Sequence, residues 1–161
     1  MTRTANRLLL LILIVATIGC DRVTKRFATE FISESPSQSF LNDFVRLDYA
    51  ENAGAFLGLG ADWPAWARAG LFTLGNGLLL VALAVAAVRA QWSGASEIGL
   101  ALFVAGGASN LVDRLVRGTV VDFLNLGIGP VRTGIFNVAD VAILLGIALL
   151  LFDRYRVRRH A

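Results

Sequence analysis

Long apolar runs alternate with polar segments along this chain, and the pattern predicts four membrane-spanning helices. The runs cover about residues 8–24, 66–88, 98–114 and 135–152. A helix needs roughly 20 mostly apolar residues to cross the hydrocarbon core of a bilayer, so each run is near the required length. We expect the polar segments at about 25–65 and 115–134 to be extracytoplasmic, and residues 1–161 to form a single integral membrane domain.

The first polar segment also carries the signal of a strand. Residues 44–49 (FVRLDY) alternate apolar and polar side chains, as a half-buried strand does. The second polar segment is rich in glycine and is expected to be a loop, although VVDF at 120–123 looks extended and buried. The predicted fold class is therefore an all-α membrane protein with four transmembrane helices and a small extracytoplasmic β element.

The first apolar run has two interpretations. Its arginines, apolar core and TIGC sequence resemble the signal of a lipoprotein that is cleaved before Cys20. The alternative is a retained first helix in which Cys20 is a small buried residue. Thr17 stands where such a signal usually has a large aliphatic side chain, and the chain crosses the membrane again later. We therefore favour the retained helix.

Composition and charge agree with a membrane protein. The chain is 56% hydrophobic with a mean hydropathy of +0.65, which is too apolar for an ordinary soluble domain of this size. The net charge of +3 does not indicate a nucleic-acid partner, because the arginines flank apolar runs and form no basic face with interleaved aromatic residues. Arginines near both termini and at position 89 fall on one side of the four-span layout. The positive-inside bias then makes both termini cytoplasmic.

The cysteine and histidine content limits the possible chemistry. Cys20 is the single cysteine and His160, in the C-terminal tail, is the single histidine. This excludes an internal disulfide, a cysteine- or histidine-rich metal site, and a histidine-dependent catalytic triad inside the membrane. We expect no metal and no cofactor, so any catalysis must come from carboxylates or from a Ser–Lys pair.

Residues 106–152 carry polar side chains that a membrane should reject, and these are the candidate functional groups. An ionisable side chain at the centre of a bilayer costs roughly 2.5–3.5 kcal/mol on insertion scales. In the predicted topology they gather at the outer membrane face together with polar residues from earlier segments. The set comprises Asp21, Lys25, Asn52, Asn110, Asp113, Arg114, Asp122, Asn137 and Asp140.

Two of these groups suggest a reaction. Asp122 and Asp140 are carboxyls in apolar surroundings, and two such carboxyls at one depth share a proton. The ionised carboxyl can take a proton from water while the protonated one polarises a peptide carbonyl. From spacing alone the alternatives are an ion pair with Arg114 or separate interfacial caps. Likewise, Asp21 and Lys25 at i and i+4 form either a surface ion pair or a pair that orients the site.

Five short motifs occur in order along the chain: DRVTK, ENAGAF, SNLVDR, GTVVDF and FNVAD. Together they resemble the lipoprotein signal peptidases, also called signal peptidase II, from about residue 7 to residue 152. The resemblance implies a four-helix aspartyl endopeptidase of the bacterial inner membrane. Such an enzyme removes the signal peptide from prolipoproteins by cutting before a diacylglyceryl-modified cysteine.

The resemblance also implies roles for residues and partners. Asp122 and Asp140 match the catalytic dyad. The remaining positions match groups that line or support the site: Asp21, Lys25, Asn52, Gly54, Asn110, Asp113, Arg114 and Asn137. Expected partners are diacylglyceryl-modified prolipoproteins, membrane lipid and globomycin-type inhibitors, and we expect a monomer.

The chain departs from the family pattern at two places. Ser109 replaces a usual glycine, and the GAF of the second motif is one residue short.

Three rival functions stay open at this point. One rival is a Ser–Lys signal peptidase that pairs Lys25 with one of several serines, at 33, 35, 37, 39 or 109. The others are a small channel or ion carrier that uses the two aspartates, and a catalytically silent paralogue that only binds.

Overall fold

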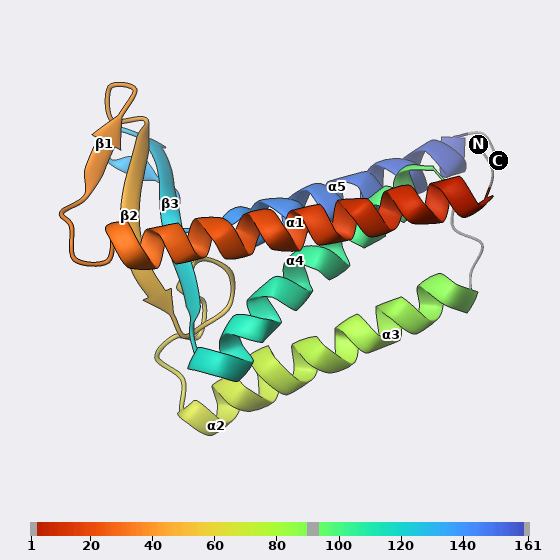
Figure 1. Ribbon diagram of the computed structural model, residues 1–161, viewed down its shortest axis with the longest axis horizontal. Coiled ribbons are helices and arrows are strands. Elements are labelled where there is room, and N and C mark those ends of the chain that lie inside the picture. The colour runs from red at the N-terminus through yellow and green to blue at the C-terminus, as the bar shows by residue number, and fades with distance from the viewer. Residues whose placement is uncertain (1–2, 90–93, 160–161) are drawn as a thin grey trace.

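The computed structural model describes residues 3–89 and 94–159 (Figure 1). Most of the chain is helical: α1 spans Arg3–Phe31, α4 spans Ala95–Arg117 and α5 spans Val138–Arg159. A further helical segment runs without a break through α2 (Ala65–Arg68), the π-helical η2 (Ala69–Gly75) and α3 (Asn76–Arg89). His160 and residues 90–93, between the predicted second and third spans, lie outside the described residues.

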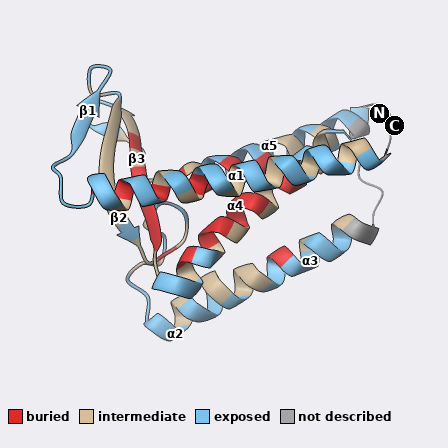
Figure 2. Cartoon of the chain, viewed as in Figure 1, coloured by how far each residue is buried: buried red, intermediate tan, exposed pale blue. Residues whose placement is uncertain are grey.

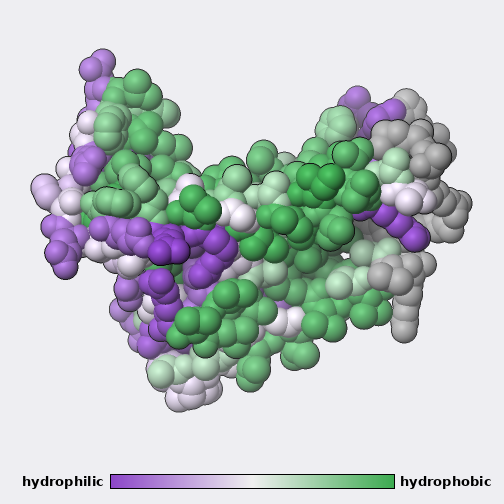
Figure 3. Space-filling model, viewed as in Figure 1, coloured by the Kyte–Doolittle hydropathy of each residue, from purple (hydrophilic) through white to green (hydrophobic). Residues whose placement is uncertain are grey.

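The helices are packed lengthwise, and a small sheet closes one end of the bundle (Figure 1). The start of α1, the end of α3, the start of α4 and the end of α5 all lie at the opposite end. The arginine-rich ends of the chain are therefore remote from the sheet. Polar side chains gather near both ends, and the surface between them is largely apolar (Figure 3).

Two helical segments of the described chain are long and apolar enough to cross a membrane by length and composition, Ala65–Ala87 and Ala95–Arg117. These correspond to the predicted second and third spans. The predicted first and fourth spans lie in α1 and α5, where charged residues bound shorter apolar stretches, at 8–20 and 141–152. Each stretch is shorter than the roughly 20 residues that a straight crossing takes.

The sheet is antiparallel with strand order β1-β2-β3-β4. Its strands are β1 Gln38–Phe40, β2 Val45–Asn52, β3 Val120–Ile128 and β4 Val131–Arg132. The strand expected at residues 44–49 is found as β2. The segment at 115–134 is not the loop that we expected, because β3 and β4 lie within it. Between β2 and α2 the chain forms a short 3-10 turn, η1 (Phe56–Gly58).

The sheet packs on the last turns of α1. Val121 and Phe123 of β3 form a buried cluster with Ala28 and Ile32, and this cluster brings β3 against the bundle (Figure 2). The same contact explains why α1 continues through Cys20 and past the predicted span end at residue 24, as far as Phe31. The predicted extracytoplasmic segment at 25–65 therefore begins inside a helix.

Helices α4 and α5 approach closely where glycines replace larger side chains. A Cβ atom on Gly106 would lie 2.4 Å from the backbone oxygen of Ala139. Gly99 and Gly146 face each other in the same way further along the two helices. Because small residues allow the two backbones to touch, the polar groups next to Gly106 and Ala139 come within hydrogen-bonding distance.

Candidate active site

The alternation of β3 places Asp122. Successive side chains of a strand point to opposite faces, so the packing of Val121 and Phe123 on α1 turns Asp122 away from α1. Its side chain is 2% exposed. Asn52 Nδ2 donates to one carboxylate oxygen at 2.9 Å, and Asn137 Nδ2 donates to the other at 2.6 Å. Asp122 is thus buried and held by an amide on each oxygen.

The start of α5 places Asp140. Asn137 precedes the first residue of the helix, and its Oδ1 accepts a hydrogen bond from the Asp140 backbone N–H at 2.9 Å. In return, the Asn137 backbone N–H donates to Asp140 Oδ2 at 3.2 Å. This reciprocal pair is a capping box, which satisfies N–H groups that a helix end leaves unpaired. Just before it, Phe136 pairs with Leu124 of β3, so that the Asn137 side chain reaches both Asp122 and the start of α5.

A buried amide and a buried lysine support this arrangement from α4 and α1. Asn110 Nδ2 donates to Asp140 Oδ1 at 2.9 Å, and Asn110 Oδ1 accepts from Lys25 Nζ at 2.7 Å. Lys25 also forms ion pairs with Asp21 and Asp113, each at 2.8 Å. Lys25 is 3% exposed and Asp21 is fully buried, so their pair is not a surface ion pair.

Asp21 links this charged network to α5. One of its carboxylate oxygens accepts from the backbone N–H of Ala139 at 2.8 Å, in the first turn of α5. The other accepts from Ser109 Oγ at 2.6 Å. Ser109, the departure from the family's glycine, is therefore used as a hydrogen-bond donor in the core of the network.

The same contacts weaken the Ser–Lys alternative. In the described part of the chain, no hydrogen bond joins Lys25 to any of the five candidate serines. Lys25 instead lies against two carboxylates and the oxygen of Asn110. A lysine that activates a serine must contact its hydroxyl, and the Lys25 ammonium contacts other groups instead.

Arg114 and the turn after β2 form the outer side of the site. Arg114 Nη2 donates to the backbone oxygen of Gly54 at 2.8 Å. Asn52 Oδ1 accepts from the Gly54 N–H at 2.9 Å and so holds the turn. A Cβ atom on Gly54 would lie 2.4 Å from the backbone oxygen of Leu59, so a larger residue cannot fit without moving the backbone. This explains the glycine of the ENAGAF motif.

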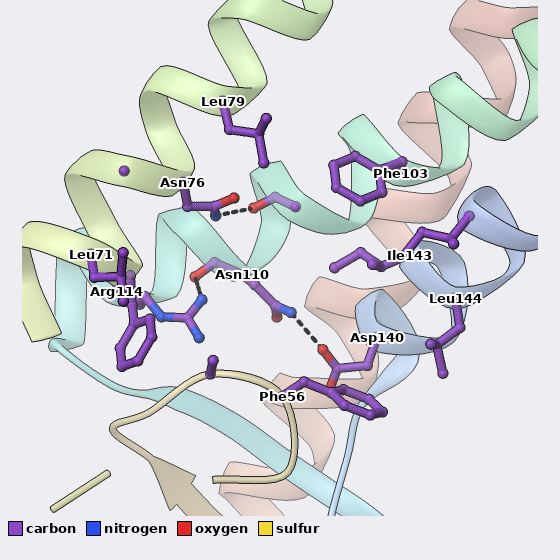
Figure 4. A pocket seen from close by; sticks show the side chains of 15 residues that line it. Phe56, Leu71, Asn76, Leu79, Phe103, Asn110, Arg114, Asp140, Ile143 and Leu144 are labelled. Carbon is purple, nitrogen blue, oxygen red and sulfur yellow. Dashed lines mark hydrogen bonds between the residues drawn. The ribbon is translucent and has the colours of Figure 1, made fainter. Parts of the chain in front are cut away.

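A cavity of about 550 Å³ opens beside these groups (Figure 4). Its wall is mostly apolar and comes from η1, η2, α3, α4 and α5. The polar side chains among its lining residues are Asn76, Asn110, Arg114 and Asp140. Asp122 is not a lining residue and lies behind the cavity, where Asn137 connects it to Asp140.

The electrostatics of Asp122 follow from its burial. Removal from water raises the pKa of this carboxyl to about 6, since the anion is poorly solvated there. The hydrogen bond from Asn52 acts in the opposite direction, and the nearby Asp140 carboxylate adds to the increase. Asp122 lies on β3, outside the apolar helical segments. A carboxyl with this pKa can exchange a proton close to neutral pH.

Every candidate residue lies in or directly against this network, including the turn residues Asn52 and Gly54. Asp113 is held between Lys25 and Arg22. Within the described residues, no group of three or more His, Cys, Asp or Glu side chains is arranged to hold a metal ion. The sequence interpretation missed Asn76 and Arg22. Asn76 is a polar residue within an apolar run, a signal that could have identified it.

Comparison with known proteins gives a consistent identity. Residues 13–156 match the family described as Signal peptidase (SPase) II. The lipoprotein signal peptidase of Sphingopyxis alaskensis is 40% identical over 132 residues, covering 81% of this chain and 75% of that protein. The lipoprotein signal peptidase of Syntrophomonas wolfei is 33% identical over 147 residues, covering 88% and 91%. A solved bacterial membrane enzyme superposes with a TM-score of 0.80 at 25% identity, covering 91% of this chain and 87% of that one. The chain belongs to the signal peptidase II family.

Proposed function

We propose that this peptidase cleaves its substrate with Asp122 and Asp140 as an aspartyl dyad. The observation that carries the proposal is Asn137, which bonds to Asp140 at the wall of the cavity and to Asp122 behind it, and so ties the two residues together. One carboxyl is ionised and takes a proton from water. The other is protonated and donates a hydrogen bond to the scissile carbonyl, so that water attacks without a metal or a covalent intermediate.

The substrate that fits this site is a prolipoprotein whose cysteine carries a diacylglyceryl group. The cavity is apolar except for a few polar groups, and a second apolar hollow of about 250 Å³ continues from it between α3, α4 and α5. A signal peptide and acyl chains can occupy such walls. Arg114 supplies a cation at the cavity wall for an ester or peptide carbonyl oxygen. A cyclic peptide of the globomycin type would compete for the same space.

The proposed setting is the bacterial inner membrane, with all four helical segments crossing it. The arginines at the helix ends remote from the sheet then lie in the cytoplasm with both termini. The sheet and the dyad lie toward the outer face, where a lipidated cysteine would be presented. A monomer suffices, because every group of the proposed mechanism comes from one chain.

We expect the dyad to show in the pH dependence of cleavage. When the pair loses its last proton, no acid remains, so kcat/KM should fall on the alkaline side with an apparent pKa above that of an ordinary carboxyl. The raised pKa of Asp122 also means that the folded protein keeps a proton that the unfolded chain has lost between pH 3.8 and about 6. The free energy of unfolding should therefore fall as pH rises through that window.

The measurement is the initial rate of cleavage of a diacylglyceryl-modified precursor in detergent, from about pH 4 to pH 9. As a control for unfolding, aliquots are held at each pH and then assayed at the pH of highest activity. They should recover full activity. A value of kcat/KM that is constant across this range would contradict a mechanism with a shared carboxyl proton.

A further inference from the structure

Asn76 is the single polar side chain that the segment of η2 and α3 contributes to the cavity, among the residues that the structure describes. Its neighbours on that wall are Leu71, Phe72, Gly75 and Leu79. A polar side chain within an apolar helix is costly unless it finds a partner. It also directly follows the π-helical turn η2, and such turns occur frequently at functional sites.

The hydrogen-bonding capacity of Asn76 is largely unused. Its Nδ2 lies 3.5 Å from the backbone oxygen of Gly107, which is longer than the usual range of about 2.7–3.2 Å for such bonds (Figure 4). An asparagine has two N–H donors and a carbonyl oxygen that accepts. Within the described chain, no hydrogen bond is formed to Asn76 Oδ1, and the residue borders the cavity. A strong acceptor is therefore available to a ligand.

The position of Asn76 relative to the dyad indicates which ligand group it would meet. Gly107 precedes Asn110 by three residues on α4, and a helix rises 1.5 Å per residue. The contact of Asn76 is thus about 4.5 Å further from the sheet end of the bundle than Asn110, which bonds to Asp140. An extended peptide covers this distance with one or two residues, at about 3.3 Å each.

A peptide bound for hydrolysis must be extended at the scissile bond, and its backbone N–H groups then lose their helical partners. In an apolar groove those groups need new acceptors, because no water replaces them. We propose that Asn76 Oδ1 accepts a hydrogen bond from a backbone N–H of the signal peptide, one or two residues before the scissile bond. Asn76 is then a substrate-binding residue that helps to set where the signal peptide is cut. This inference rests on the proposed function.

The test replaces the donor in the substrate as well as the acceptor in the protein. Lipidated precursors are made with an ester in place of the peptide N–H at the first, second or third position before the cut. Wild type, Asn76→Leu and the control Leu78→Ala are assayed with each precursor. Leu78 lies on the exposed side of α3 and does not line the cavity.

At either the first or the second ester position, but not at the third, we expect wild-type kcat/KM to fall about tenfold, the usual size of one lost hydrogen bond. Asn76→Leu should show a similar loss with the all-amide precursor and no further loss with that ester. Wild-type cleavage that is unchanged by all three esters would overturn the inference. This comparison uses wild type alone and so does not depend on the folding of a variant. If the loss from Asn76→Leu and the loss from the ester multiply at every ester position, the inference would also be overturned.

Affinity for each precursor is measured in parallel, which separates this inference from the proposed function. If wild type binds but does not cut the all-amide precursor, the proposed function fails. The Asn76 contact is still supported if one ester weakens binding to wild type and has no effect on binding to Asn76→Leu. If that ester weakens binding to wild type and to Asn76→Leu equally, the Asn76 contact would be overturned.

Discussion

Asp122→Asn and Asp140→Asn should each lower kcat/KM for a lipidated precursor by about a thousandfold or more. Asparagine keeps the shape of the side chain but neither takes up nor releases a proton. Each carboxylate accepts hydrogen bonds on both oxygens, so the amide of the variant keeps one of these bonds and loses the other, at a cost of about 1–3 kcal/mol. Neutralising the buried Asp122 also removes the cost of a poorly solvated charge. We therefore expect folded proteins that are inactive.

Thermal unfolding in detergent checks that both variants are folded, and Asp62→Asn serves as the matched control. Asp62 is an exposed carboxylate in the turn before α2, and its replacement should leave the rate unchanged. If either dyad variant is folded and keeps about a tenth of wild-type activity, it is not a proton-transfer group in the sense proposed.

Lys25→Met should unfold at a temperature lower by about 10 °C or more. The substitution keeps an apolar stem of similar length but removes the charge between Asp21 and Asp113. Two buried carboxylates would then face each other, and Asn110 Oδ1 would be left with the longer hydrogen bond from Asn137 Nδ2, at 3.3 Å. Breaking a buried pair in this way typically costs about 3–5 kcal/mol. Because Asn110 bonds to Asp140, activity should fall as well.

The control lies one residue further along the same helix. Arg26 pairs with Glu30 at i and i+4, as Lys25 pairs with Asp21 at the same spacing. Its side chain is 81% exposed, so Arg26→Met should leave the unfolding temperature unchanged. An unfolding temperature for Lys25→Met equal to that of wild type would mean that the buried ion-pair network does not support the fold.

This contrast between Lys25 and Arg26 illustrates what sequence could and could not predict. The i, i+4 spacing of Asp21 and Lys25 was evident, but their burial depends on Ser109 and Asp113, which are far along the chain. For the same reason the helix α1 was expected to end near its charged residues, whereas it continues to Phe31. Distant partners, which local patterns do not reveal, decide how deep a charge lies.

The sheet gives a similar lesson. The strand β2 alternates clearly and was predicted, whereas β3 lies in a glycine-rich segment and pairs with β2 from some seventy residues away. The candidate site residues were recognisable because polar groups are costly in apolar runs, and ordered motifs added to that signal. Asn76 was missed because it is isolated in its run and belongs to none of those motifs.

The most direct test of the central claim is identification of the bond that the protein cuts. Purified protein in detergent is incubated with a diacylglyceryl-modified precursor, and the products are identified by mass spectrometry. We predict one cut, with the lipidated cysteine as the new N-terminus, and no cut of the unlipidated precursor. A folded wild-type protein that leaves the lipidated precursor intact, or cuts it elsewhere, would contradict the account.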